Sequence, residues 1–443
     1  MILLLQYETI NSIIVSEVMK MKFHESKNVE LKAKYTKSLL KTVSAFSNFH
    51  DGYIYVGIND QGEVVGLPNI QEEKMIIENS INTTITPKPF FDMNILEFDG
   101  KTILEIKVYK GNNGPYYYQN TAYMRNDTST VPVDGSNLTR LTLISKNLTY
   151  DQLKVSQSDL SFNYLKEKMS SVLHVTDINQ AVLTTFGLFI DKTYTNAALL
   201  LSDNGSASQS YVDIARFKLD TNIFLDRKRF ENQSLLKYFD QSITYFQTQY
   251  PSYQSVEGIQ RTTKEQVPLV AFREALSNAI IHRDYLLNSG VQISMFENRI
   301  EIVSPGGLPE GMDEEQYYRG LTSLTRNPII ANVFFRLNLI EQFGTGIRRI
   351  IDSYKLYKIQ PSFDIQKFLI RIILPVTNFD YSKLEKKEAI LAYLHAYPKS
   401  SRQNIENAIK IEKSTLIRRL NELDEQGFVS KSGNGPSTIY YCK

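Results

Sequence analysis

The last sixty residues of the chain carry three helical patterns followed by a hairpin, and this fixed order constrains the fold more than any other feature. Apolar residues recur at helical spacing in each of the three patterns. The segments are Lys386–Tyr397, a short helix capped by Ser400 or Ser401, Lys413–Gln426, and a hairpin between Phe428-Val429 and Thr438–Tyr441 that turns at Gly433-Asn434-Gly435. The order predicts a small domain with three helices and a β-hairpin.

This order is the plan of a winged helix-turn-helix, in which the third helix enters the major groove of DNA. Residues 383–443 hold 11 Lys/Arg and 7 Asp/Glu, a local excess of positive charge. Arginine and hydroxyl side chains suit phosphates and base edges, so we expect DNA contacts from the third helix. The candidates are Ser414, Thr415, Arg418 and Arg419. The alternative is a winged helix that contacts only protein.

Length and composition limit the number of domains, the kind of nucleic-acid surface and the kinds of site that the chain can form. A chain of 443 residues is too long for one ordinary core, and its formal net charge of +2 requires any nucleic-acid surface to be local. One cysteine, Cys442, excludes a disulfide framework and a cysteine-rich zinc site. No segment reaches membrane length without charge, so we expect a cytoplasmic protein without membrane contact.

The chain is expected to be a multidomain α+β protein with four regions. In the first domain we expect a helix from about Thr36 to Asn48 and a strand at Tyr53–Ile58, which a hairpin turn at Asp60-Gln61-Gly62 joins to Val64-Val65. The aromatic run Tyr116–Tyr118 is expected to be a strand with alternate rings buried, or a surface that stacks on unpaired bases. A polar stretch precedes the last domain. The regions are a lead-in at 1–24, an α+β domain at 25–145, a mixed domain at 150–380 with its informative motifs between 270 and 350, and the winged helix at 381–443.

One helical face in the second domain has the residue types of a nucleotide site. Glu274, Asn278 and His282 recur every four residues, which aligns a carboxylate that can orient water with an amide oxygen that can ligate Mg²⁺. Two glycine loops follow, Ser304-Pro305-Gly306-Gly307 and Gly344-Thr345-Gly346, the second of which opens a helix. Glycines at a helix start let backbone N–H groups approach phosphate. Each signal alone also fits a solvated helix face or an ordinary turn.

Together and in this order, these motifs resemble the GHKL ATPase family, which implies an α/β sandwich that binds ATP and Mg²⁺. By that resemblance Glu274 is the general base and Asn278 the magnesium ligand, while the nucleotide is lined by His282, Gly306, Gly307, Gly344, Thr345 and Gly346. Ser304-Pro305 stand where the family carries an aspartate that reads adenine, which is a departure from the pattern. A degenerate, purely structural version of the site stays open as the alternative, as does the question of hydrolysis.

The first domain begins with an acidic and basic run, Glu25-Ser26-Lys27-Asn28-Val29-Glu30-Leu31-Lys32. If this run is extended, Glu30 and Lys32 project to the same side. Carboxylates beside a lysine can hold Mg²⁺ or Mn²⁺ and stabilise a phosphoryl transition state. A salt-bridged strand face explains the same residues. Lysines around the first helix form either a phosphate-facing patch or a solvated edge; they are Lys27, Lys32, Lys34, Lys37 and Lys41.

Residues 25–134 resemble the AlbA-type domain of the Schlafen family. The resemblance runs through Glu25-x4-Glu30-Leu31-Lys32, Ala45-Phe46-Ser47-Asn48, Gly52–Asp60, Gly66, Pro115-Tyr116 and Tyr123-Met124-Arg125. In Schlafen ribonucleases two glutamates at this spacing and a later acid cut RNA, which implies catalytic roles for Glu25, Glu30 and Asp60 with Lys32 beside them. Prokaryotic proteins with this domain order are described as transcriptional regulators or as RecG-related. No Gly-x4-Gly-Lys-Ser/Thr loop occurs, which excludes a P-loop helicase motor.

Two functions therefore stay open. The first is a homodimeric DNA-binding transcriptional regulator whose GHKL-like domain binds ATP and Mg²⁺ and thereby modulates DNA binding. The second is a metal-dependent nuclease that acts on RNA or DNA through Glu25, Glu30 and Asp60.

Overall fold

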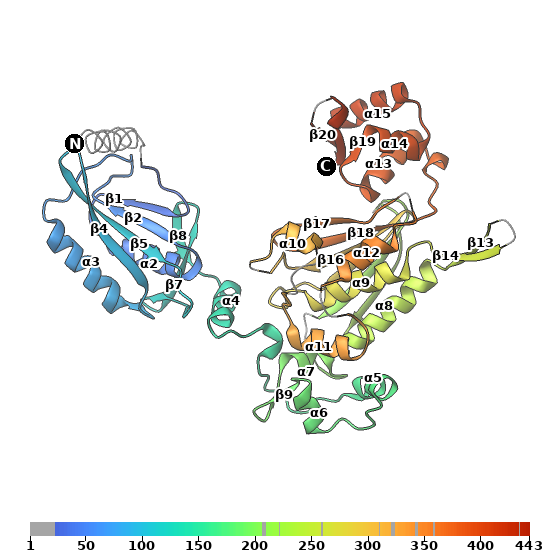
Figure 1. Ribbon diagram of the computed structural model, residues 1–443, viewed down its shortest axis with the longest axis horizontal. Coiled ribbons are helices and arrows are strands. Elements are labelled where there is room, and N and C mark those ends of the chain that lie inside the picture. Colours follow the sequence, from blue (N-terminus) through green and yellow to red (C-terminus); the bar gives the residue numbers. More distant parts are fainter. Residues whose placement is uncertain are drawn as a thin grey trace, which may run out of the picture. The chain divides into compact units, whose positions relative to one another are not determined.

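In the computed structural model, two helix-and-sheet units follow each other along the chain (Figure 1). The structure describes residues 23–205, 210–220, 222–257, 260–309, 311–319, 324–341, 344–357, 359–433 and 435–443. The first unit ends at Leu148 and the second begins at Thr149. Most of the predicted lead-in, 1–24, lies outside the described residues.

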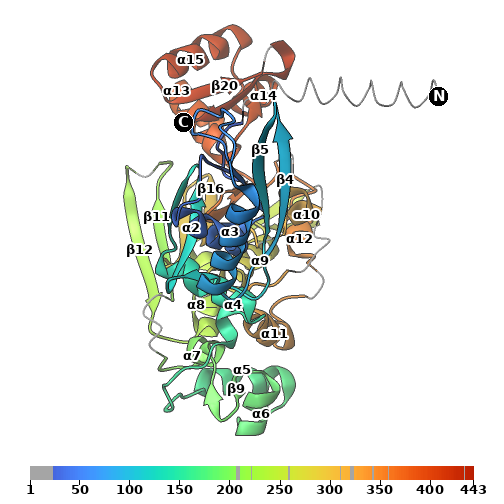
Figure 2. The same cartoon turned by 90° about the vertical axis from the view of Figure 1, so that its left-hand side faces the viewer.

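The first unit packs one helix between two sheets. Its elements are β1 (Val29–Lys32), α2 (Ser38–Phe49), β2 (Gly52–Val56), α3 (Ile70–Thr84), β3 (Ile85–Thr86), β4 (Phe90–Phe98), β5 (Lys101–Tyr109), β6 (Tyr117–Tyr118), β7 (Thr121–Asn126), β8 (Ser129–Pro132) and α4 (Gly135–Ser145). The four-stranded sheet has the order β1-β2-β5-β4, and the second sheet the order β3-β6-β7-β8. Helix α2 contacts β5 of the first sheet and β7 of the second, so its side chains form the centre of this core. Figure 2 shows α2 and α3 beside the long strands β4 and β5.

Hydrophobic periodicity explains these elements. In α2, Leu39, Leu40, Val43 and Phe46 are fully or almost fully buried at helical spacing, as the sequence predicts. In β2 buried and partly exposed residues alternate. A side chain at Gly52 would collide with the ring of Phe46, because its Cβ would lie 2.4 Å from Cδ2 of the ring. The strand ends at Val56 rather than at Ile58, because Gly57 adopts a positive φ of 104°.

The predicted hairpin after β2 is shorter than expected. Only an isolated bridge joins Ile58 and Val64, and no strand continues through Val65. Tyr117 and Tyr118 of the tyrosine run at 116–118 form β6, and Tyr116 and Tyr118 are buried while Tyr117 is partly exposed.

The second unit is built on a mixed six-stranded sheet. Its elements up to residue 375 are η1 (Tyr150–Gln152), α5 (Asn163–Leu173), α6 (Gln180–Thr185), β9 (Phe189–Ile190), β10 (Thr193–Tyr194), α7 (Asn196–Leu201), β11 (Tyr211–Phe217), β12 (Phe224–Glu231), α8 (Leu235–Gln249), β13 (Tyr253–Glu257), β14 (Gln260–Lys264), α9 (Leu269–Ile281), β15 (Val291–Met295), β16 (Arg299–Pro305), α10 (Glu314–Arg319), α11 (Pro328–Arg336), α12 (Gly346–Ser353), β17 (Ser362–Ile365) and β18 (Leu369–Pro375). The strand order is β12-β11-β15-β16-β18-β17.

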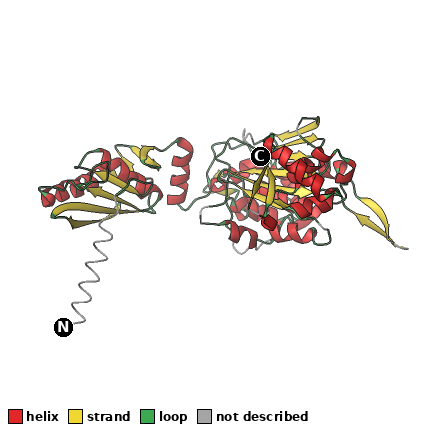
Figure 3. Cartoon of the chain, turned by 90° about the horizontal axis from the view of Figure 1, so that it is seen from above, coloured by secondary structure: helices red, strands yellow, loops and turns green. Residues whose placement is uncertain are grey.

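Helices cover one face of this sheet, and α9 lies at the centre of that layer. Helix α9 contacts β16, β18, α8 and α12, and Figures 1 and 3 show these helices stacked over the strands. Ile214, Ile293, Ile302 and Ile372 project from four of the strands into the shared core. Most of α9 is buried, which places its few polar side chains inside the unit.

The C-terminal region, residues 381–443, contains the predicted three helices and hairpin. Its elements are η2 (Tyr381–Lys383), α13 (Lys386–Ala396), β19 (Ser400–Ser401), α14 (Arg402–Ile409), α15 (Lys413–Glu425), β20 (Val429–Ser432), η3 (Gly435–Ser437) and β21 (Ile439–Cys442). Ser401 caps α14 by accepting a hydrogen bond from the backbone N–H of Asn404. The strands form a small sheet of order β19-β21-β20.

A buried asparagine fastens the C-terminal region to the large sheet. Asn298, in the turn between β15 and β16, is fully buried and donates from Nδ2 to the carbonyl of Ala392 in α13 at 2.7 Å. Its own carbonyl accepts from the backbone N–H of Val376, just after β18, at 2.9 Å. The ends of β16 and β18 are therefore held against α13.

Candidate functional site

Helix α9 and the start of α12 bring together the residues expected to bind nucleotide. A Cβ at Gly346 would lie 3.2 Å from Oε2 of Glu274 and 3.1 Å from Nδ2 of Asn278. The missing side chain thus lets the first turn of α12 contact both polar groups. Glu274 and Asn278 lie one turn apart on α9, as their spacing predicts.

Two adjoining cavities meet at these residues. The polar one has a volume of about 350 Å³ and is lined by Glu274, Thr325, Asn332, Glu341 and Thr345, among others. The other is smaller, about 100 Å³, and mainly apolar; its walls include Ile302, Leu308, Ile347, Ile370 and Ile372. Asn278, His282, Gly344 and Gly346 line both. An apolar cavity that opens into a polar one suits a ligand with a flat apolar end and a charged end.

Glu274 is a buried carboxylate with arginine partners. The residue is 3% exposed, and its Oε1 lies 2.9 Å from Nη1 of Arg349 and 3.8 Å from Nη2 of Arg273. Burial raises the pKa of Glu274, while the charges of Arg349 and Arg273 lower it by less. A carboxylate whose pKa is raised is a stronger proton acceptor than an ordinary one.

His282 lies at the end of α9 rather than within it. It is the C-cap residue, and its backbone N–H donates to the carbonyl of Asn278. Burial, together with the positive charge of Arg326, lowers the pKa of His282 to about 4, so the ring is neutral at pH 7. No hydrogen bond between the described side chains joins His282 to Glu274 or Asp284. It lines the cavities instead.

The first glycine loop serves packing as much as binding. Gly306 has a φ of 101°, and a Cβ there would lie 2.3 Å from Nη1 of Arg326. A Cβ at Gly307 would lie 2.5 Å from the carbonyl oxygen of Lys367. Gly307 lines the apolar cavity, but Gly306 is absent from the described lining of both. The expectation that Gly306 lines a nucleotide therefore has no support in the geometry.

Ser304 occupies the apolar cavity wall where the resemblance calls for an aspartate. Its Oγ donates to the carbonyl of Ala279 at 2.9 Å. A hydroxyl group has one proton and two lone pairs. Since that proton is used, Ser304 offers only an acceptor to a ligand.

The polar groups fit a magnesium-nucleotide. Oγ1 of Thr345 is buried and forms no hydrogen bond with the described residues, whereas Oε1 of Glu274 is buried and has its ion pairs with Arg349 and Arg273. The Asn278 side chain likewise has no hydrogen-bond partner among them, and amide and carboxylate oxygens are preferred Mg²⁺ ligands. Asn278 is the residue that would hold the ion, and a bound Mg²⁺ would neutralise phosphate charge.

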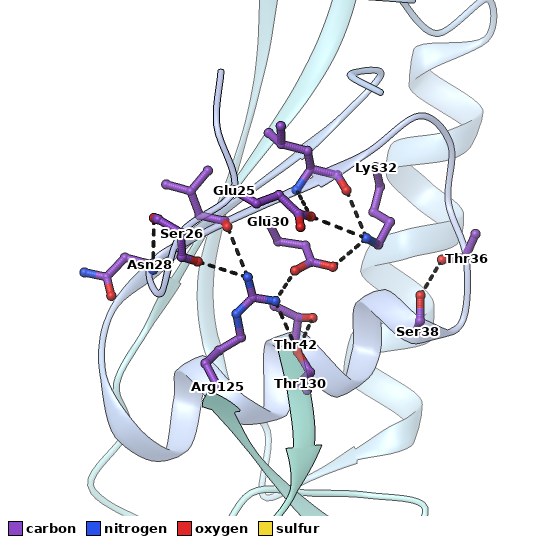
Figure 4. Close-up of polar contacts among 12 residues, drawn as sticks. Glu25, Ser26, Asn28, Glu30, Lys32, Thr36, Ser38, Thr42, Arg125 and Thr130 are labelled. Carbon is purple, nitrogen blue, oxygen red and sulfur yellow. Dashed lines mark hydrogen bonds and ion pairs between the residues drawn. The ribbon is translucent and has the colours of Figure 1, made fainter. Parts of the chain in front are cut away.

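The acidic run of the first unit forms an ion-pair network on the α2 side of β1 (Figure 4). Glu30, whose side chain is 7% exposed, pairs with Arg125 of β7 and with Nζ of Lys32 at 2.6 Å. Arg125 also donates to Oγ1 of Thr130 and to the carbonyls of Ser26 and Val29. Glu25 lies at the rim, 3.8 Å from Lys32. Two cations therefore already neutralise Glu30.

The predicted third acid does not join this network. Asp60 is exposed in the turn after β2, and none of its side-chain contacts reaches Glu25 or Glu30 in the described structure. Within the described ranges no three His, Cys, Asp or Glu side chains are grouped to hold a metal ion. The geometry corresponds to the alternative of a salt-bridged strand face.

Basic side chains remain exposed beside this network. Lys27, Lys34, Lys37 and Lys41 all face solvent, and Nζ of Lys41 lies 5.6 Å from the centre of the Tyr123 ring. Lys32 does not belong to this exposed set, because it pairs with Glu30 and Glu25.

Helix α15 exposes only part of its predicted DNA-binding set. Leu416, Leu420 and Leu423 are buried in the core of the C-terminal region. Ser414 is exposed, Thr415 partly exposed, and the Arg418 side chain is 66% exposed. The Arg419 side chain is 26% exposed and donates from Nη1 to Oε2 of Glu422 at 2.8 Å. Arg418 is therefore better placed for DNA than Arg419.

Comparison with protein families finds one match in each unit. Residues 25–134 match the family described as "Schlafen, AlbA_2". Residues 288–374 match the family described as "Putative ATP-dependent DNA helicase recG C-terminal". This RecG-type match begins after α9, so Glu274 and Asn278 lie outside it.

Solved structures give two further likenesses. The DIP2311 protein from Corynebacterium diphtheriae is 17% identical, with coverage of 94% of this chain and 92% of that one and a TM-score of 0.47. The N-terminal domain of a "Putative ATP-dependent DNA Helicase RecG-related Protein" from Nitrosomonas europaea is 27% identical, with coverage of 22% and 73% and a TM-score of 0.19. No curated protein matches the chain. Among the described residues, no helix has the length and apolar character needed to cross a bilayer.

Sequence reasoning missed two arginines. Arg125 appeared only as part of the AlbA-type motif, and Arg349 only as part of an apolar-basic helix. The structure makes them the partners of Glu30 and Glu274. A usable signal existed for Arg349, because it follows Gly346 by three residues and so lies on the same side of α12.

Proposed function

We propose that the chain is a DNA-binding transcriptional regulator whose second unit binds a magnesium-nucleotide. The observation that carries this proposal is the meeting of Glu274, Asn278 and Gly346 at the junction of an apolar and a polar cavity. A base in the apolar cavity and phosphates in the polar one would use both halves. Hydrolysis is not part of the proposal, because binding alone is enough to bias DNA affinity.

The C-terminal region supports the DNA-binding part of the proposal. We infer that residues 381–443 are a winged helix whose α15 contacts DNA through Lys413, Ser414 and Arg418, all exposed. A helix whose inner face is fixed by buried leucines and whose outer face is basic suits the major groove. The exposed lysines of the AlbA-type domain offer a second phosphate-facing surface.

A physical path connects the cavities with the C-terminal region. Ile302 and Ser304 of β16 and Ile370 and Ile372 of β18 line the apolar cavity. The opposite ends of the same strands are held against α13 through Asn298. A ligand that shifts these strands would therefore act on the helices expected to meet DNA.

The test is a titration of labelled random-sequence duplex DNA, followed by fluorescence anisotropy at several salt concentrations. We expect binding that weakens steeply with salt and that changes several-fold when ATP and Mg²⁺ are added. In the Asn278→Ala variant, DNA binding persists but its response to nucleotide disappears. Binding that ignores nucleotide in the unmodified protein would contradict the regulator, and absence of salt-sensitive binding would contradict the DNA contact.

No observation favours the nuclease alternative, since Glu30 is neutralised by Arg125 and Lys32. The same samples test it directly. RNA and DNA incubated with Mg²⁺ or Mn²⁺ should remain intact on a denaturing gel. Cleavage that is lost in a folded Glu30→Ala protein would reverse this conclusion.

A further inference from the structure

We propose that Arg349 recognises the terminal phosphate of a nucleoside triphosphate, exchanging its ion pair with Glu274 for the phosphate. Arg349 would thus be the residue that makes the site respond to triphosphate rather than diphosphate. The inference rests on the proposed nucleotide binding and adds to it the residue that selects the ligand.

The position of Arg349 is the first support. It lies one turn after Gly346 on α12, where an added Cβ would lie within 3.2 Å of the Glu274 and Asn278 side chains. Nη1 of Arg349 lies 2.9 Å from Oε1 of Glu274 and 3.0 Å from Oε1 of Glu341. Both carboxylates line the polar cavity. The guanidinium group therefore joins two carboxylates of the cavity that would receive phosphates, although Arg349 is not itself among the residues that line it.

The unused donors of Arg349 are the second support. Both ion pairs use Nη1, whereas Nη2 and Nε form no hydrogen bond with any residue in the described part of the chain. An arginine has five N–H donors, and a phosphate accepts two of them side by side. The side chain is 27% exposed, so a ligand can reach it.

The charge of the polar cavity is the third support. Its described lining includes Glu274 and Glu341 but neither lysine nor arginine. A triphosphate placed there would be repelled by both carboxylates unless a cation intervened. Arg349 contacts both carboxylates and is the cation best placed to do so. Its move to phosphate would also release Glu274 from its closest positive partner.

The neighbouring Arg348 provides a matched control. It has the same charge, lies on the same helix and is exposed, and no ion pair to it is found among the described residues. If bulk positive charge on α12 were enough to attract phosphate, Arg348 and Arg349 would contribute alike.

The test is calorimetric binding of Mg²⁺ with ADP and with a non-hydrolysable ATP analogue, so that turnover plays no part. The unmodified protein should prefer the triphosphate. Arg349→Gln should weaken triphosphate binding by about tenfold or more and leave ADP affinity within about twofold, as expected for a lost bidentate phosphate contact. Arg348→Gln should change neither affinity.

A second variant guards against a merely structural effect, because Arg349→Gln leaves Glu274 buried without its partner. Glu274→Gln removes the competing carboxylate, so triphosphate affinity should rise rather than fall. The role of Arg349 would be overturned if folded Arg349→Gln kept the preference for triphosphate, or if Glu274→Gln bound triphosphate more weakly. Either result would leave the proposed nucleotide site itself standing. If the unmodified protein binds neither nucleotide, the proposed nucleotide site itself fails, and this inference fails with it.

Discussion

Glu30 and Glu274 are both buried carboxylates paired with arginine, yet their surroundings give them different roles. Both oxygens of Glu30 are taken, one by Arg125 and the other by Lys32, and Arg125 is fixed by three further acceptors. Glu274 has ion pairs through Oε1 and lies beside a cavity. The first arrangement holds a fold together, and the second leaves room for a ligand.

Replacing Glu30 should therefore reduce stability. In Glu30→Gln, the buried Arg125 loses its counter-charge, and we expect the free energy of unfolding to fall by about 3 kcal/mol. Glu25→Gln is the control, because this rim carboxylate should contribute less than about 1 kcal/mol. Urea denaturation measures both, and equal stability of the two variants would show that the network does not support the fold.

Ser304 should make the site prefer adenine. Its only proton is donated to Ala279, so it can accept from the amino group of adenine but cannot donate to the carbonyl of guanine. Calorimetry should show tighter binding of ATP than of GTP, and Ser304→Ala should reduce that ratio by about tenfold. A ratio that Ser304→Ala leaves unaltered would place the base elsewhere.

His282 should make the stability of the second unit depend on pH. Its pKa is near 4 in the folded protein and near 6.5 when unfolded, so below pH 6.5 the unfolded chain binds a proton that the folded chain excludes. Stability from this residue is complete above pH 6.5 and decreases by roughly 2 kcal/mol as the pH falls toward 4. Urea titrations between these pH values should show a smaller decrease in His282→Gln. If the free energy of unfolding decreased equally in both proteins, the pKa of His282 would not be lowered by folding.

At the scale of elements, local periodicity predicts helices well. The sequence predicts a helix at 413–426, and α15 spans Lys413–Glu425; it predicts 36–48, and α2 spans Ser38–Phe49. Each of these segments carries a strong apolar stripe, so its own residues are enough to predict which side of the helix is buried. The turn after β2 is harder to predict from sequence, because Gly57 ends the strand early and the Asp60 side chain is exposed to solvent.

The exposed side of α15 gives a prediction of its own. Arg418→Ala should weaken binding to duplex DNA by about tenfold and reduce the dependence on salt by about one phosphate contact. Arg419→Ala is the matched control, because its guanidinium group is engaged by Glu422; DNA affinity should change by less than about threefold. If Arg419→Ala lost more DNA affinity than Arg418→Ala, the side of α15 that carries Arg419 would have to face the DNA.

At the scale of the whole molecule, the sequence gives the order of the parts but not the contacts between distant segments. The boundary near 148, the nucleotide-site motifs and the C-terminal helices can be read locally. The pairs Glu30–Arg125 and Glu274–Arg349 join residues far apart in the chain, and only the fold brings them together. Asn298 against Ala392 is a third such contact, and it gives the proposed regulator its mechanical connection.

The central claim is that the junction of the two cavities binds a magnesium-nucleotide, and calorimetry with ATP and Mg²⁺ tests it most directly. The unmodified protein should bind ATP in a magnesium-dependent manner, and Asn278→Ala should abolish that binding without loss of the folded state. The account would be contradicted if the unmodified protein gave no heat of binding at ATP concentrations on the order of millimolar. It would also be contradicted if Asn278→Ala bound ATP with undiminished magnesium dependence.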